Sequence, residues 1–167
     1  MSHSVTPENQ YLTLVEQGEI THDQSQFSAI QSIQLLYEKI IQPQARKSLF
    51  NVLSRNKPII PQGLYLTGGV GTGKTMLMDI FCHSLPEKSA HRIHFHRFMQ
   101  SVHEQKHNIK NEQNPLDIIA KNLSSEYRLL CLDEFAVTDI TDAMILSGLL
   151  DSLFSNCLLY TSDAADE

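Results

Sequence analysis

The stretch GGVGTGKT at residues 68–75 limits the folds open to this chain more than any other part of its sequence. It fits the pattern G-x-x-x-x-G-K-[ST], in which glycines let consecutive backbone N–H groups converge on phosphate oxygens without side-chain clash. Such a loop lies between a strand and a helix, whose N-terminus attracts the same anion. The apolar run at 63–67 and the helical apolar pattern at 75–85 predict both elements. We therefore expect a nucleotide-binding loop made of Gly68, Gly69, Val70, Gly71, Thr72, Gly73, Lys74 and Thr75.

Two carboxylates end a second apolar run, and they are candidates for binding the metal ion and activating the water in nucleotide hydrolysis. Asp133 and Glu134 follow LLCL at 129–132, a pattern typical of a buried strand. Lys74 would reach the β- and γ-phosphates, and the Thr75 hydroxyl would ligate Mg²⁺. Asp133 would hold the same ion, usually through water, while Glu134 would orient or deprotonate the attacking water. The pattern predicts a Mg²⁺-dependent nucleoside-triphosphate hydrolase with Lys74, Asp133 and Glu134 as catalytic residues.

The rest of the core alternates between strand and helix patterns. RIHFHRF alternates apolar and polar residues, so we expect a strand at 92–98 with His94 and His96 on one face. Helical patterns follow at 99–110, 115–123 and 139–154. This order predicts an α/β fold, a P-loop three-layer sandwich with a parallel sheet.

Residues 1–56 predict a helical region ahead of that core. The threonine–proline pair at 6–7 marks a helix start, since a hydroxyl cap precedes proline at the first helical position. A second helix is expected to begin near 21–23, with apolar residues at spacings of three and four. The pattern continues after a break at 49–53, and 54–61 is expected to be a connector. This region is either a scaffold or a surface that docks a partner.

Composition and charge argue against several functional classes. The net charge of −6 disfavours a general nucleic-acid-binding surface, so we expect no nucleic acid partner. The sequence has neither a run near eighteen apolar residues nor an apolar signal core at its start, so we expect a cytoplasmic protein without membrane insertion. Cys82, Cys131 and Cys157 are widely spaced, as expected of reduced thiols.

The stretch VHEQKH at 102–107 presents a rival chemistry. His103, Glu104 and His107 spell H-E-x-x-H, which on a helix directs two imidazoles to one zinc ion, and Glu126 lies where one class of zinc peptidases has its third ligand. However, a chain with eight histidines matches such a pattern easily by chance. Glu126 also falls in SSEYR, which we expect to be a connector. A zinc metallopeptidase is therefore the weakest of our alternatives.

The stretches around the loop and the carboxylates resemble the ZapE family of cell-division ATPases, which is AFG-like. The resemblance is carried by TPENQYLTLVEQGEI, GLYLTGGVGTGKTMLMDIF, RIHFHRFMQSVHE, PLDIIA and LLCLDEFAVTDITDAMIL, and it covers most of residues 5–154. It implies a core of the AAA+/ASCE type, ATP and Mg²⁺ as cofactors, and protein remodelling at the FtsZ ring in cell division. It also implies that residues 68–75 bind ATP and that Asp133 and Glu134 form the Walker B pair. Ala136 departs from the family, in which a bulky or amide side chain is expected.

The C-terminal residues 155–167 depart further from that family. Its members continue with a strand that ends in a sensor residue and then an arginine finger, whereas this chain reads SNCLLYTSDAADE. We expect this segment to be a non-native tail, so that the ATPase core at 57–154 is truncated at its C-terminus. Without the sensor strand at the centre of the sheet, each buried backbone group that lost a partner would cost roughly 1–3 kcal/mol, and the fragment would be unstable or inactive. In the alternative, LLYTS is a genuine strand, with Ser162 or Asp163 near the sensor position.

A third interpretation is a nucleotide-binding adaptor or loader that does not hydrolyse ATP. Glu134 disfavours it, because a water-orienting carboxylate is present. An arginine finger would have to come from a neighbouring subunit, which is the reason to consider a homo-oligomer.

Overall fold

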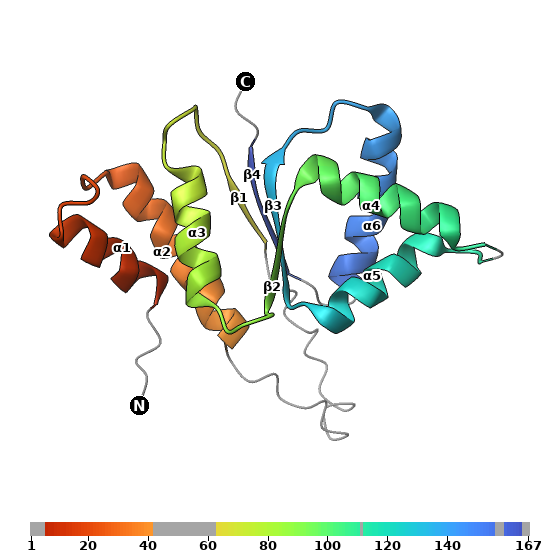
Figure 1. Cartoon of the computed structure of the whole chain (residues 1–167), viewed down its shortest axis with the longest axis horizontal. Helices are drawn as coiled ribbons and strands as arrows, with labels where there is room; N and C mark the ends of the chain where they lie inside the picture. Colours follow the sequence, from red (N-terminus) through yellow and green to blue (C-terminus); the bar gives the residue numbers. More distant parts are fainter. Residues whose placement is uncertain (1–5, 42–62, 111, 156–158, 165–167) are drawn as a thin grey trace, which may run out of the picture.

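The computed structural model of the chain places a parallel sheet between two layers of helices (Figure 1). It describes residues 6–41, 63–110, 112–155 and 159–164. Within these residues the strand order is β1-β4-β3-β2, and every neighbouring pair is parallel, which confirms the predicted three-layer α/β fold. The elements in chain order are α1 (Pro7–Glu16), α2 (Gln24–Ile41), β1 (Leu64–Leu66), α3 (Lys74–Ser84), β2 (Ala90–His94), α4 (Phe95–Asn108), α5 (Pro115–Glu126), β3 (Leu129–Phe135), α6 (Ile140–Ser155) and β4 (Leu159–Ala164).

Alternate residues of β3 point to opposite faces of the sheet and belong to separate cores. Leu129 and Cys131 pack with residues of α1, α2 and α3. Leu130 and Leu132 pack with residues of α4, α5 and α6. All four side chains are buried, as expected for a parallel strand covered on both faces. Burial of one leucine contributes about 1.5–3 kcal/mol, so β3 is held firmly from both sides.

The N-terminal helices begin where the sequence predicts and share the core of α3. Thr6 caps α1 by accepting a hydrogen bond from the Asn9 backbone N–H, and proline follows at the first helical position. Asp23 caps α2, since its Oδ1 accepts the Gln26 backbone N–H at 2.9 Å. The Tyr11 hydroxyl contacts the Asp23 backbone at 3.2–3.3 Å and ties the two helices together. The predictions for 49–53 and 54–61 lie outside the described residues.

The predicted strand at 92–98 is correct only as far as His94. At Phe95 the chain turns into α4, so His96 lies on a helix, and the prediction that it shares a strand face with His94 is wrong. The reason is that Phe95 also begins a helical apolar series, which continues with Phe98, Met99 and Val102. All four of these side chains are buried against the core of α5 and α6. RIHFHRF therefore contains the end of a strand pattern and the start of a helix pattern.

The C-terminal residues 159–164 form the central strand β4, between β1 and β3. Leu64 of β1 pairs with Thr161, and Leu129 of β3 pairs with Leu159. The prediction that the sheet lacks its central strand is therefore wrong, and the alternative of a genuine strand at LLYTS is correct for the residues of that run that the structure describes, 159–162. Thr161 is fully buried, and its hydroxyl lies 3.9 Å from the Met78 sulfur. The edges of β1 and β3 that the loss of this strand would leave unpaired are both paired with β4, which removes the physical basis for an unstable fragment.

Candidate active site

The loop between β1 and α3 has the backbone geometry that phosphate binding requires. Gly71 and Gly73 have φ angles of 76° and 88°, in the left-handed region that favours glycine. Gly73 stands at the start of α3 and supplies no side chain to cap its N-terminus. No side chain of the N-cap residue therefore competes with an anion at the N-terminus of α3, where the helix dipole attracts negative charge.

Lys74 folds back over this loop. The residue is 8% exposed, and its Nζ donates to the carbonyl oxygens of Gly68 at 2.8 Å and Gly69 at 3.0 Å. These contacts hold a buried ammonium group above the loop amides. A phosphate oxygen is a stronger acceptor for such a group than a carbonyl, so Lys74 is suited to bind the anion that the loop attracts.

The end of β3 has one carboxylate with a free acceptor. Asp133 Oδ2 accepts a hydrogen bond from Arg92 Nε at 2.7 Å. Asp133 Oδ1 is buried and has no hydrogen-bond partner among the described residues. A buried carboxylate oxygen without a partner is costly unless a cation or its bound water fills that role. Together with Thr75, at the second position of α3, these donors fit Mg²⁺.

Glu134 has a strained backbone and an exposed side chain. Its φ of 55° is uncommon for a residue with a Cβ, and it lies within an irregular step of the β3–β4 pairing between Leu132 and Phe135. Its side chain is 74% exposed, and Oε2 lies 3.7 Å from His94 Nδ1. Strain of this kind costs on the order of 1–3 kcal/mol and is found at functional sites. The irregular step turns Glu134 out of the strand, so that it can meet solvent water.

Arg92 of β2 joins the phosphate-loop helix to β3. Besides Asp133, it contacts Asp79 of α3 through Nη1. Burial disfavours the charged form of Arg92, but the hydrogen bonds to the two carboxylates outweigh burial and raise its pKa above the ordinary value. Sequence reasoning missed this residue, because an arginine in an alternating strand carries no signal of what it contacts across the sheet.

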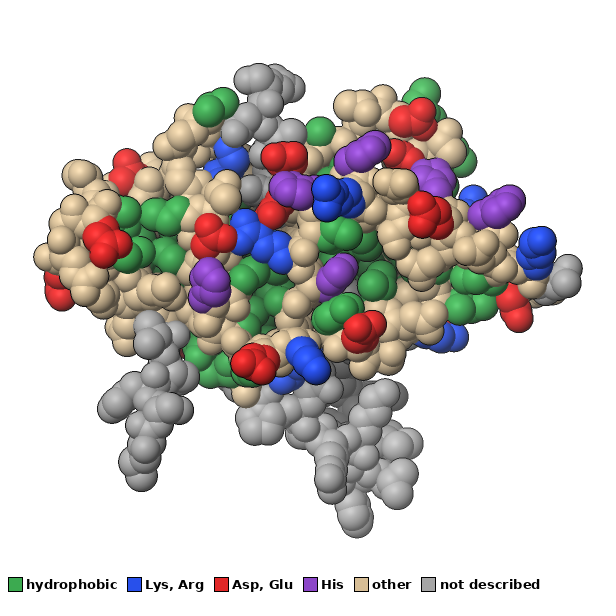
Figure 2. Space-filling view, in the orientation of Figure 1, with side chains coloured by type: hydrophobic (Ala, Val, Ile, Leu, Met, Phe, Trp, Pro, Cys, Tyr) green, Lys and Arg blue, Asp and Glu red, His purple; other side chains and the backbone are tan. Residues whose placement is uncertain are grey.

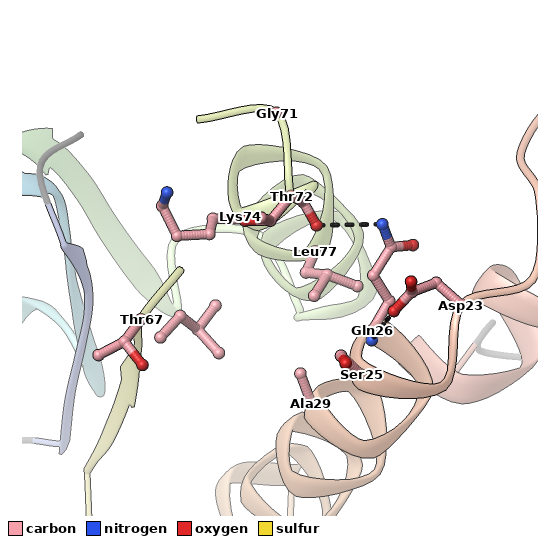
Figure 3. A pocket seen from close by; sticks show the side chains of 10 residues that line it. Asp23, Ser25, Gln26, Ala29, Thr67, Gly71, Thr72, Lys74 and Leu77 are labelled. Atoms are coloured by element: carbon pink, nitrogen blue, oxygen red, sulfur yellow. Dashed lines mark hydrogen bonds between the residues drawn. The ribbon is translucent and has the colours of Figure 1, made fainter. Parts of the chain in front are cut away.

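A pocket of about 390 Å³ lies beside the loop, between α2 and α3 (Figure 3). Gln26 of α2 donates from Nε2 to the Thr72 carbonyl at 3.0 Å, while Lys74 extends on the other side of the loop. The N-terminal region thus forms one wall of the site, which its helical pattern did not predict. The lining residues are Asp23, Ser25, Gln26, Ala29, Leu66, Thr67, Gly71, Thr72, Lys74 and Leu77.

The H-E-x-x-H residues lie apart from this site on α4. His103 Nε2 contacts Asp142 Oδ1 of α6 at 2.6 Å. Glu126 is the last residue of α5 and accepts a hydrogen bond from the Tyr127 hydroxyl, so the prediction that it lies in a connector is wrong. In the part of the chain that the structure describes, no three His, Cys, Asp or Glu side chains are grouped closely enough to hold a metal ion.

Two further features of the molecule are the distribution of charged side chains on its surface and the polarity of its helices. On the face shown in Figure 2, basic side chains are interspersed with acidic ones and form no continuous groove among the described residues. No helix in the described ranges is both long enough and apolar enough to cross a bilayer.

The strand order, the loop before α3 and the acidic end of β3 define a P-loop core with a fold of the AAA+ type. The fold is similar to that of AMPPCP-bound DnaA from Aquifex aeolicus, with a TM-score of 0.56 and 17% identity over 98% of this chain and 43% of that one. Residues 5–165 match the AFG1-like ATPase family, and the chain belongs to that family.

The matched range includes β4. The chain is 42% identical over 163 residues to cell division protein ZapE of Escherichia coli (strain K12), with 91% of this chain and 44% of that protein covered. It is also 42% identical over 110 residues to lactation elevated protein 1 homolog B of Danio rerio, with 59% of this chain and 22% of that protein covered. The chain thus spans less than half the length of these relatives.

Proposed function

We propose that the chain binds ATP with Mg²⁺ and hydrolyses it. The observation that carries the proposal is the placement of Lys74 and Asp133 after the two strands that flank β4: Lys74 begins the helix that follows β1, and Asp133 lies near the end of β3. Ligands of α/β proteins bind at this edge of the sheet, where the carboxyl ends of the strands meet the helix N-termini. The buried ammonium of Lys74 and the unpaired oxygen of Asp133 suit a phosphate and its cation.

Each group then has one role in the reaction. The amides of the loop and Lys74 bind the phosphates, and Thr75 with Asp133 holds Mg²⁺, which supplies charge neutralisation when bound. Glu134 orients the attacking water and accepts its proton. The pocket beside Gln26 has the size of small-ligand sites and gives room for the nucleoside.

At the cellular level, we propose that ATP hydrolysis drives remodelling of a client protein in cell division in the cytoplasm. The proposal rests on the similarity to a protein named for cell division and on the resemblance of the sequence motifs to the ZapE family. The client that this family implies is FtsZ, the tubulin-like protein of the division ring. The chain is expected to sediment with FtsZ polymers when ATP is present and to stay in the supernatant when ATP is left out. An equal amount in the pellet with and without FtsZ would refute this part of the proposal.

Phosphate release tests the catalytic part. Glu134→Gln is expected to bind ATP like the unaltered chain but to release phosphate about 10²–10⁴-fold more slowly, because the proton acceptor is gone. Lys74→Ala is expected to lose ATP binding itself. Turnover that rises with protein concentration would indicate an arginine finger supplied by a second copy. Tight ATP binding without phosphate release at any protein concentration would contradict hydrolysis and favour the adaptor.

A further inference from the structure

Arg92 forms a charged bridge between the two halves of the candidate site. It lies on β2, where it pairs with Cys131 of β3, and it contacts Asp79 on α3 and Asp133 at the end of β3. The side chains of Arg92 and Asp133 are 25% and 14% exposed, whereas that of Asp79 is 47% exposed. We call Asp79, Arg92 and Asp133 the charged triad.

The two carboxylate oxygens of Asp133 differ in their hydrogen bonding. Arg92 Nε donates to Oδ2 of Asp133, whereas Oδ1 of the same carboxylate is buried without a partner in the described residues. An ion pair that served only to fasten β2 to β3 would gain nothing from a buried acceptor left unpaired, since that atom carries a desolvation cost. Oδ2 of Asp133 is therefore held by the guanidinium of Arg92, and Oδ1 remains available to a different partner.

The charges of the triad sum to −1, with two carboxylates and one guanidinium. Without Asp79, the guanidinium would neutralise Asp133 and weaken its attraction for a cation. With Asp79 on the other arm of Arg92, one negative charge remains at the site. The planar fork of an arginine is needed for this, because a single ammonium does not present the same fixed pair of donors to two carboxylates.

We propose that Arg92 and Asp79 are positioning residues for the Mg²⁺ site, in which Arg92 fixes the orientation of Asp133 and Asp79 offsets the charge of Arg92. The inference rests on the proposed binding of Mg²⁺ and ATP. Neither residue touches the nucleotide in this scheme. Both act through Asp133. Their loss therefore lowers the gain in ATP affinity that Mg²⁺ provides, and it leaves the affinity of the loop for the phosphates without Mg²⁺ unchanged.

The test is the affinity of the 167-residue chain for a fluorescent ATP analogue, measured with Mg²⁺ and with EDTA. Asp79→Asn and Arg92→Lys are each expected to lose about fivefold or more in affinity with Mg²⁺ and to stay within about twofold of the unaltered chain in EDTA. Raising the Mg²⁺ concentration should restore the affinity of Asp79→Asn. Asp151→Asn on α6 removes the same charge away from the site and serves as the matched control.

Two results would overturn the inference. In one, both variants gain as much affinity from Mg²⁺ as the unaltered chain does. In the other, both lose affinity equally with Mg²⁺ and in EDTA, which means that the triad supports the fold and not the cation. If the unaltered chain itself gains nothing from Mg²⁺, the proposed function fails first, and the two failures are thereby distinguished. Thermal unfolding with and without Mg²⁺ gives a second readout that does not depend on the fluorophore.

Discussion

Gly73→Ala tests whether the phosphate loop depends on the backbone conformation and the packing seen in the structure. The φ of 88° at this position costs a residue with a Cβ roughly 1–2 kcal/mol. A Cβ there would also lie 2.8 Å from Gln26 Nε2, so the amide has to move and its hydrogen bond to the Thr72 carbonyl is lost. That loss adds about 0.5–1.5 kcal/mol. The expected destabilisation is about 1.5–3.5 kcal/mol, or about 3–14 °C in the midpoint of thermal unfolding.

Alanine substitutions at the neighbouring glycines separate the backbone cost at Gly73 from the cost of the lost hydrogen bond. Gly71 has a φ of 76°, and a Cβ added there would meet no other atom within 4 Å, so Gly71→Ala should show the backbone cost alone. Gly69 has neither a positive φ nor a close neighbour, and Gly69→Ala should change stability by less than about 1 kcal/mol. In a Gln26→Ala background, the excess cost of Gly73→Ala over Gly71→Ala should vanish. Urea unfolding of the single and double variants measures these differences, and equal stabilities of Gly69→Ala and Gly73→Ala would refute the reasoning.

Three further predictions concern β4, Glu134 and the thiols. A chain that ends at Ser155 lacks β4, so β1 and β3 lose their shared neighbour. Its free energy of unfolding should fall by an amount comparable with a domain's whole stability, about 5–15 kcal/mol. Unfolding followed by circular dichroism measures this loss, and an unchanged unfolding midpoint would contradict it. Glu134→Gly should relieve the left-handed strain and raise stability by about 1 kcal/mol in urea while phosphate release is lost, and a lower stability would argue against strain at this position. The contact with Cys131, at 3.7 Å between the sulfurs, lowers the pKa of Cys82 despite its burial, so its thiolate forms at a lower pH than that of an ordinary thiol. Peptide-resolved alkylation of Cys82 should accordingly reach half its maximal rate at a lower pH than alkylation of buried Cys131, and faster labelling of Cys131 would refute this.

The loop before α3 and the strand β3 could be predicted from the sequence because their requirements are local. A turn that needs left-handed backbone at Gly71 and Gly73 excludes most other residues, and an apolar run before Asp133 identifies a strand covered on both faces. The start of α2 was also predictable, since Asp23 caps it through a contact three residues away.

The errors arose where a short pattern fits two structures. Phe95 satisfies both the alternation of β2 and the helical series of α4, and only packing against the core of α5 and α6 decides between them. The run at 159–164 departs from the family that the rest of the sequence resembles and is therefore predicted to be a non-native tail, but its place in the sheet is decided by its neighbours β1 and β3. Contacts between distant segments, such as those of Arg92 with Asp79 and of Gln26 with Thr72, leave no pattern in the sequence at all.

The central claim is that Lys74 on the loop and Asp133 on β3 form one Mg²⁺–ATP site, and calorimetric titration of ATP into the chain and into Asp133→Asn tests it most directly. The unaltered chain should bind ATP more tightly with Mg²⁺ than in EDTA. Asp133→Asn keeps the shape of the side chain but removes its charge, so it should bind ATP in EDTA with unchanged affinity and gain little from Mg²⁺. An equal gain from Mg²⁺ in both proteins would contradict the claim.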